Sequence, residues 1–259
     1  MSNHYCLVTG ASSGIGREIA RVLASEKRNL ILVARDGARL EALATELRAR
    51  AIYVEVMAFD LSAQHAADTL VTTIHERGLT VDVLVNNAGF GVFGRYDQTA
   101  LDDEQQMVDL NVTALTRLTK LLLPAMRTRG AGRILNLASI AGFLPGPNMA
   151  VYYATKAYVL SYSQALAEEL RATGITVTAL CPGLTESGFV DKAGMQSSVL
   201  VKGKRLPTSR EVAVFGVAAM HRGEAVAIHG WRNRLLATGL RLLPRSLVTR
   251  AVARLSRPA

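Results

Sequence analysis

Near its start the chain reads Thr9-Gly10-Ala11-Ser12-Ser13-Gly14-Ile15-Gly16, directly after the apolar run Tyr5–Thr9. The next segment, Gly14–Glu26, repeats apolar residues at helical spacing, so the pattern predicts a strand, a glycine-rich turn and a helix. In such a unit the backbone can approach a pyrophosphate, and the helix N-terminus supplies free N–H groups and a partial positive charge. We therefore expect a dinucleotide to bind Gly10, Ser12, Ser13, Gly14, Ile15 and Gly16. A tight turn without a ligand is the alternative.

Apolar runs and amphipathic segments alternate along the rest of the chain. The runs predict strands at Tyr5–Thr9, Asn29–Ala34, Ile52–Met57, Val81–Val85, Arg133–Leu137, Ile175–Leu180 and Ala225–His229. Helices are expected at Gly14–Glu26, Ala38–Arg50, Ala63–Arg77, Asp102–Arg129, Tyr152–Ala172 and Ser209–Arg222. Strands that are apolar on both faces and separated by helices indicate a parallel sheet covered on both sides. We expect a single α/β domain over residues 1–230, with a Rossmann-type, doubly wound, seven-stranded and mostly parallel sheet.

The composition suits a globular protein with a sizeable core, since 49% of the 259 residues are apolar and 20% are charged. The polar start predicts no secretory signal, and arginines interrupt the most apolar stretch, Leu235–Leu255, before it reaches the length of a membrane-spanning helix. Cys6 and Cys181 both lie in apolar runs. They are expected to be buried hydrophobes rather than a disulfide or metal ligands, which predicts a cytoplasmic protein without a metal site.

The net charge of +9 is concentrated in the last part of the chain, where seven arginines and no acidic residue follow Glu224. No nucleic-acid-binding module or interleaved aromatic residues accompany this charge, so nucleic acid is not an expected partner. Residues 231–259 are expected to form a basic, amphipathic, helical extension, with one apolar stripe along Pro244–Leu255. Such a helix can cap the substrate cleft, pack against a second subunit or lie on an anionic membrane surface. The two protein contacts are favoured over the membrane.

The end of the second strand predicts which nicotinamide cofactor is bound. An acidic residue there would bind the 2′-hydroxyl of NAD, whereas an arginine favours the 2′-phosphate of NADP. The sequence has Ala34 at the expected acidic position and Arg35 directly after it, which favours NADP(H) over NAD(H). Asp36 is the competing candidate, but it begins the next helix and is better interpreted as an N-cap.

Candidate catalytic side chains follow the fourth and fifth strands, at the edge where an open parallel sheet binds ligands. The fourth strand leads into Asn86-Asn87-Ala88-Gly89 and the fifth ends at Ser139, shortly before a helix that begins Tyr152-Tyr153-Ala154-Thr155-Lys156. Residues four apart share one face of a helix, so Tyr152 and Lys156 can point into the same cleft, whereas Tyr153 is expected to pack or to form a wall.

An ordinary phenol has a pKa of about 10, and lowering it to about 7 takes roughly 4 kcal/mol. One ammonium at about 4 Å, in an effective dielectric near 20, supplies about that much. We therefore expect Lys156 to tune Tyr152 as the proton donor or acceptor that accompanies hydride transfer, with Ser139 orienting the reacting oxygen.

Together these motifs resemble the short-chain dehydrogenase/reductase family from Cys6 to about Gly230. The resemblance implies a catalytic tetrad of Asn111, Ser139, Tyr152 and Lys156, with a main-chain distortion at Asn111 that holds a water linking Lys156 to solvent. Ala114, where many relatives have glycine, is a mild departure. A homodimer or homotetramer is expected. Further cofactor contacts are implied for Asp60, Leu61, Asn87, Ala88, Gly89, Pro182, Gly183 and either Ser187 or Thr185.

The leucine- and arginine-rich ending resembles a poorly characterised bacterial branch of the family, near enzymes that reduce 3-oxoacyl or other hydrophobic carbonyls. The expected function is therefore NADP(H)-dependent hydride transfer between the nicotinamide and a carbonyl or secondary alcohol of an apolar small molecule. A non-catalytic NADP(H)-binding sensor or scaffold is the alternative, and epimerisation through a transient ketone fits the same tetrad. The irregular stretch at residues 184–207 is expected to be a substrate loop, with disorder as its alternative.

Overall fold

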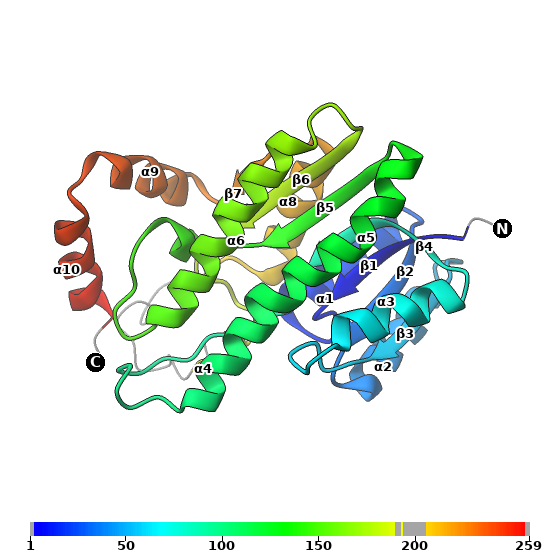
Figure 1. Ribbon diagram of the computed structural model, residues 1–259, viewed down its shortest axis with the longest axis horizontal. Helices are drawn as coiled ribbons and strands as arrows, with labels where there is room; N and C mark the ends of the chain where they lie inside the picture. The colour runs from blue at the N-terminus through cyan, green and yellow to red at the C-terminus, as the bar shows by residue number, and fades with distance from the viewer. Residues whose placement is uncertain (1–2, 190–192, 194–205, 257–259) are drawn as a thin grey trace.

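The computed structural model describes residues 3–189, 193 and 206–256, and its centre is a seven-stranded sheet (Figure 1). In this described part every neighbouring pair of strands is parallel, in the order β3-β2-β1-β4-β5-β6-β7. The predicted doubly wound α/β fold is therefore confirmed, and the sheet is wholly parallel. The strands are β1 His4–Thr9, β2 Asn29–Ala34, β3 Val54–Ala58, β4 Thr80–Asn86, β5 Gly132–Leu137, β6 Ile175–Cys181 and β7 Val226–Ile228.

The helices follow the predicted segments, with one difference. The segment expected as one long helix, residues 102–129, is divided by a π-helical turn into three consecutive pieces. The α-helices of the main body are α1 Gly14–Ser25, α2 Gly37–Arg48, α3 Ala66–Glu76, α4 Leu101–Val108, α5 Leu115–Arg129, α6 Ala150–Glu169 and α8 Ser209–His221. The π-helical turn is η1 Asp109–Ala114, and a short 3-10 helix, η2 Ile140–Phe143, follows β5.

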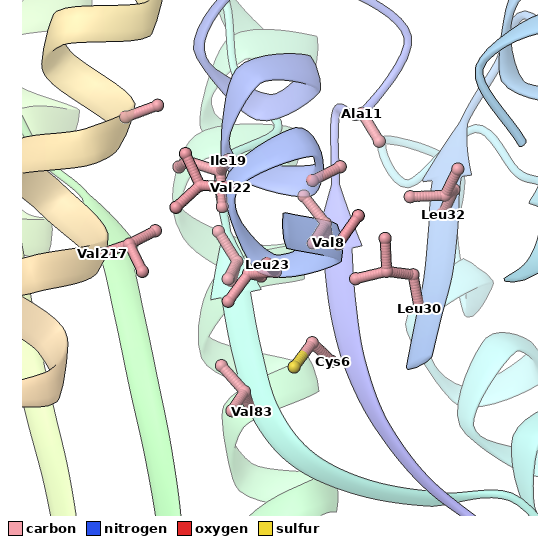
Figure 2. Packing of buried hydrophobic residues seen from close by; sticks show 14 of the residues in the cluster. Cys6, Val8, Ala11, Ile19, Val22, Leu23, Leu30, Leu32, Val83 and Val217 are labelled. Atoms are coloured by element: carbon pink, nitrogen blue, oxygen red, sulfur yellow. The ribbon is translucent and has the colours of Figure 1, made fainter. Parts of the chain in front are cut away.

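Two apolar layers enclose the sheet. One layer packs α1, α2 and α8 against one face, and the other packs α3, α5 and α6 against the opposite face (Figure 1). Figure 2 shows the first layer, in which Val8 and Leu30 of the sheet meet Ile19 and Leu23 of α1, with Val217 of α8 beside them. Burying both faces of a parallel sheet explains why its strands are continuously apolar.

The strand order reverses between β1 and β4, since β2 and β3 lie on one side of β1 and the later strands lie on the other. In an open parallel sheet, ligands bind in the crevice outside the carboxyl ends of the strands at this switch point. Here those ends are Thr9 of β1 and Asn86 of β4. The fold therefore places the glycine-rich turn next to the segment that follows β4.

A buried polar network connects the sheet to the two helices behind it. The side chain of Asn86 donates to Thr119 on α5 at 3.1 Å and to Asn136 on β5 at 2.9 Å. Asn136 in turn donates to the hydroxyl of Ser163 on α6 at 2.9 Å. Because buried polar groups need partners, this network fixes α6 against the carboxyl ends of β4 and β5. Helix α6 also carries Tyr152 and Lys156.

The chain continues after β7 into a C-terminal extension, which comprises α9 Trp231–Gly239, η3 Leu240–Leu242 and α10 Arg245–Leu255. In Figure 1 it lies at the end of the molecule opposite the N-terminus, beyond the carboxyl ends of the strands. The helix predicted along Pro244–Leu255 is present and begins directly after Pro244. Within the described residues, no helix combines the length and the apolar character needed to span a membrane.

The buried network generates a stability prediction with a matched control on the same helix. Ser163→Ala leaves the buried amide of Asn136 without its acceptor, so we expect the free energy of unfolding to fall by about 1–3 kcal/mol. Ser161→Ala, at an exposed position of α6, should change it by less than about 0.5 kcal/mol. Urea denaturation followed by circular dichroism measures both values. Equal effects of the two substitutions would contradict a stabilising role for the network.

Candidate functional site

A cavity of about 1540 Å³ lies along the carboxyl ends of the strands. One end is formed by the glycine-rich turn and the other by the C-terminal extension. The cavity is lined by most of the residues predicted from the sequence, whereas two of them, Gly16 and Asn111, do not line it. Those that do are Gly10, Ser12, Ser13, Gly14, Ile15, Arg35, Asp60, Leu61, Asn87, Ala88, Gly89, Ser139, Tyr152, Lys156, Pro182, Gly183, Thr185 and Ser187.

The side-chain amide of Asn87 joins the glycine-rich turn to the end of β4. Its Nδ2 donates to the carbonyl of Thr9 at 2.9 Å and to that of Gly10 at 3.2 Å. A Cβ atom on Gly10 would lie 2.7 Å from this Nδ2, and one on Gly16 would lie 2.3 Å from it. Gly16 is therefore required for the close approach of α1 to Asn87, which explains why it lies behind the cavity rather than on its surface.

The N-terminus of α1 faces the cavity with its first N–H groups available to an anion. Ser13 is the N-cap residue, but its side chain makes no capping hydrogen bond, and the first turn contains no acidic residue. Gly14 has φ +55°, a conformation that favours glycine, so the turn can bring backbone close to a ligand. Unsatisfied N–H groups and the helix dipole attract phosphate at such a position. The turn therefore fits the pyrophosphate of a dinucleotide.

Arg35, in the turn after β2, lines the same cavity as the glycine-rich turn. Its side chain is 72% exposed, and its guanidinium lies 3.9 Å from the carboxylate of Asp60, a separation that leaves it available to a second anion. The carboxylate of Asp36 accepts a hydrogen bond from the backbone N–H of Arg39 at 3.0 Å and so caps the start of α2. The predicted N-cap role of Asp36 is confirmed.

Ser139, Tyr152 and Lys156 meet near the middle of the cavity, where all three are buried or nearly so. Burial raises the pKa of Tyr152, and a hydrogen bond with the side chain of Ser139 lowers it in part. Burial lowers the pKa of Lys156 to about 8, and its Nζ donates to the backbone carbonyl of Leu137 at 2.7 Å. The group thus combines a protonated phenol, a hydroxyl and a cation that remains mostly charged at neutral pH.

The electrostatic expectation for this pair needs correction. The sequence predicts that Lys156 suffices to lower the pKa of Tyr152 to about 7, but in the folded protein the phenol has a pKa above its ordinary value. Two features account for the difference. The Lys156 ammonium lies 5.8 Å from the centroid of the Tyr152 ring and is directed to Leu137, and removal of the phenol from water outweighs the attraction. The residues of the protein therefore favour the neutral phenol, which is the form that donates a proton.

Tyr153 has the structural role that its helical position predicts. Its ring packs edge-on against that of Tyr152, with 6.0 Å between centroids, and it lines the cavity. A Cβ atom on Gly146 would lie 2.2 Å from this ring, so position 146 has room only for glycine. On its other side, Tyr152 contacts Phe189 at a centroid distance of 5.2 Å. These rings hold the Tyr152 phenol in one orientation.

Asn111 lies in the π-helical turn η1, so the main-chain distortion implied by the resemblance is present. The residue is buried and its amide is fully used: Nδ2 donates to the carbonyl of Phe90 and to the hydroxyl of Thr155, while Oδ1 accepts from the N–H of Phe90. A Cβ on Gly89 would lie 2.8 Å from Oδ1 of Asn111 and 3.7 Å from Nζ of Lys156. Asn111 therefore positions the segment after β4 beside Lys156.

The segment after β6 closes the cavity near the glycine-rich turn. Thr185 donates to the carbonyl of Gly183 at 3.0 Å, and Ser187 donates to that of Thr185 at 3.3 Å. Both line the cavity, so both stay candidates for the predicted contact. A Cβ on Gly14 would lie 2.8 Å from the carbonyl oxygen of Ser187. Most of the predicted loop at residues 184–207, namely 190–192 and 194–205, lies outside the described residues.

Sequence reasoning missed two threonines that organise the site. The hydroxyl of Thr9 accepts from the N–H groups of Asn87 and Ala88 and donates to the carbonyl of Val85. Thr155 accepts from Asn111, as described above. For Thr9 the available signal was a polar residue at the end of an otherwise apolar strand, since a buried hydroxyl in that place needs partners on the neighbouring strand.

Comparison with known proteins identifies a common family. Residues 4–197 match the family model described as short chain dehydrogenase. Ketoacyl reductase HetN from Nostoc sp. is 34% identical, over 77% of this chain and 68% of that protein. Sulfoacetaldehyde reductase from Chromohalobacter salexigens is 38% identical, over 80% of this chain and 83% of that one. A short-chain dehydrogenase from Sphingobium yanoikuyae, solved in complex with NADPH, superposes with a TM-score of 0.82 at 34% identity, over 92% of this chain and 93% of that one.

The low pKa of Lys156 generates a prediction about stability and pH. Between pH 8 and 10.5 the unfolded lysine holds a proton that the folded one lacks, so the free energy of unfolding rises with pH in this window. At neutral pH the buried charge costs about 3 kcal/mol. The advantage of Lys156→Met over the wild type should therefore be largest below pH 8 and shrink towards pH 10.5.

Urea denaturation at pH 7, 8, 9 and 10 measures this difference. Lys120→Met, at an exposed position of α5, is the control for removing a lysine. A difference between Lys156→Met and wild type that stays constant across the series would contradict the shift.

Proposed function

The chain belongs to the short-chain dehydrogenase/reductase family, and we propose that it is an NADP(H)-dependent carbonyl reductase or alcohol dehydrogenase acting on an apolar substrate. Two of the relatives are named as reductases of carbonyl compounds, a ketoacyl reductase and a sulfoacetaldehyde reductase. The single observation that carries the proposal is that Ser139, Tyr152 and Lys156 line one cavity, with Lys156 one helical turn after Tyr152 on α6.

The nicotinamide, when bound, supplies or accepts the hydride. The side chains of this protein handle the oxygen and its proton. Ser139 orients the carbonyl oxygen by donating a hydrogen bond, and Tyr152 donates its proton to that oxygen as the alcohol forms. Because the pKa of Lys156 is about 8, its ammonium is mostly charged at pH 7 and stabilises the phenolate that Tyr152 becomes. Asn111 acts through its contacts with Phe90 and Thr155, as a positioning residue.

The cofactor-binding residues that we propose lie along the same cavity as Ser139, Tyr152 and Lys156. The glycine-rich turn would hold the pyrophosphate at the N-terminus of α1, and Asp60 and Leu61 would hold the adenine end. Pro182 and Gly183 would hold the nicotinamide end, together with Thr185 or Ser187. The preference for NADP(H) rests on Arg35, whose exposed guanidinium can bind the 2′-phosphate in a two-pronged way.

The apolar substrate is supported by the lining of the cavity beyond Tyr152. Among the described lining residues on that side, Arg232 at the rim is the charged one, and most of the others are aliphatic or aromatic. A sulfonated aldehyde, the substrate in the name of one relative, would require a buried cation or several hydrogen-bond donors. A compound like the ketoacyl substrate in the name of another relative suits this wall better.

The assembly and location expected from the sequence belong to the same proposal. Apolar side chains exposed on the C-terminal extension, such as Leu235 and Leu242, support a contact with a second subunit in a homodimer or homotetramer. The arginines among them suit an anionic membrane surface as the competing contact. The two buried, free cysteines support a reducing, cytoplasmic location.

Replacement of the proposed proton donor tests the reaction directly. Tyr152→Phe removes the transferable proton but keeps the ring, so we expect turnover of NADPH with ketones to fall at least about 1,000-fold while NADPH still binds. Tyr153→Phe, one residue along, should retain most of the activity because its hydroxyl has no part in the transfer. Stopped-flow absorbance follows turnover, and calorimetry follows NADPH binding. Retention of most activity by Tyr152→Phe would sink the assignment.

The cofactor preference has its own test. Arg35→Ala should lower the ratio of kcat/KM for NADPH to that for NADH by about 10- to 100-fold, the effect of losing charge-assisted hydrogen bonds to one phosphate. Arg39→Ala, in the first turn of α2, should lower it much less, because Arg39 pairs with Asp36. Steady-state kinetics with both cofactors gives the ratios. An unchanged ratio in Arg35→Ala would mean that the phosphate is held elsewhere.

A further inference from the structure

The C-terminal extension bridges the cavity and is attached on both sides of it. At its first end, α9 packs on the turn after β6: a Cβ on Gly183 would lie 2.7 Å from the amide of Asn233, which donates to the carbonyl of His229. At its other end, the amide of Asn148 donates to the carbonyl of Ser256 at 2.9 Å. Asn148 lies four residues before Tyr152, so the end of α10 is tied to the start of the catalytic helix.

One side of the extension faces the cavity with aliphatic side chains. Six of them lie along its length, and each belongs to the cavity lining: Leu236, Leu240, Leu243, Leu247, Val248 and Val252. Tyr152 and Phe189 line the same cavity, so apolar side chains are present both beside the proposed proton donor and along the extension.

Neighbouring leucines on the same helices point elsewhere. Leu235 and Leu242 are 65% and 86% exposed, and neither lines the cavity. Leu236 and Leu243, directly after them, line it but are still 48% and 53% exposed. Large aliphatic side chains that remain half exposed inside a cavity leave apolar surface in contact with water. Covering that surface with a hydrocarbon chain is favourable in proportion to the area removed from water.

We propose that the α9–η3–α10 extension is the hydrocarbon-binding wall of the substrate site, and that the substrate is a carbonyl compound carrying a straight aliphatic chain. This inference rests on the proposed function, because the chain is oriented by a carbonyl held at Ser139 and Tyr152. Leu236 and Leu243 are then specificity-determining residues. Each further methylene of the chain should raise kcat/KM about two- to fourfold until the wall is filled, since burying one CH₂ fully corresponds to about 0.8 kcal/mol.

The chain provides matched variants for a kinetic test. The ketones 2-hexanone, 2-octanone, 2-decanone and 2-dodecanone are reduced with NADPH by the wild type and two double variants. The inner variant is Leu236→Gln with Leu243→Gln, and the outer control is Leu235→Gln with Leu242→Gln. We expect kcat/KM to rise with chain length in the wild type and the outer control, and the rise to flatten in the inner variant, mainly through KM. Thermal unfolding confirms that both variants fold.

Trp231 gives a second readout that needs no turnover. It is the single tryptophan of the chain and it lines the cavity, so its fluorescence reports what enters. Titration with 2-dodecanone should change the emission saturably in the wild type and the outer control, whereas the inner variant should need at least about tenfold more ketone.

The two readouts separate the inference from the function on which it rests. Saturable binding that the inner variant weakens, without turnover of any ketone, would overturn the proposed reaction and leave the wall in place. Turnover with the same dependence on chain length in the inner and outer variants would overturn the wall, as would a wild type that is indifferent to chain length. If neither turnover nor a fluorescence change is observed, the proposed reaction and the proposed hydrocarbon-binding wall are both overturned.

Discussion

The hydrogen bonds of the Asn87 side chain are the constraint on which the rest of the site depends. They join the carboxyl end of β4 to the turn after β1, and Thr9 strengthens the same junction from the other strand. This junction lets the glycine-rich turn and the proposed catalytic group share one cavity. It also requires Gly10 and Gly16, because a Cβ atom on either would overlap the Asn87 amide. Gly10 and Gly16 are therefore needed for close packing against Asn87 at the end of β4, as well as for the approach of a phosphate.

Burial decides the chemistry at the other end of this cavity. Removing Tyr152 from water raises its pKa, and removing Lys156 lowers its pKa to about 8. Both shifts oppose ionisation, yet the lysine stays mostly charged at neutral pH while the phenol stays neutral. Such a pair is suited to giving a proton to a reacting oxygen and then stabilising the phenolate that is left. The buried network around Ser163 holds the helix on which both residues lie.

Much of the fold could be predicted from the sequence, because a parallel sheet buried on both faces needs apolar strands and each strand end is followed by polar or glycine residues. The spacing of Tyr152 and Lys156 identified the central pair, because residues four apart share one face of a helix. The π-helical turn at Asn111 was implied by the family resemblance alone, because the residue pattern of this segment predicts one continuous helix. The direction of the Tyr152 pKa shift was also beyond reach, because desolvation depends on rings such as Phe189 that only the folded chain brings together.

Direct transfer of a hydride from the cofactor to a carbonyl carbon is the central claim, and isotope transfer tests it most directly. NADPH carrying deuterium at both positions of the nicotinamide C4 is incubated with the protein and 2-octanone in ordinary water, and the alcohol is examined by mass spectrometry. The account predicts that the product gains one deuterium at the carbinol carbon, while its hydroxyl proton comes from water through Tyr152. Alcohol that carries no deuterium, or oxidation of the cofactor without alcohol, would contradict the account.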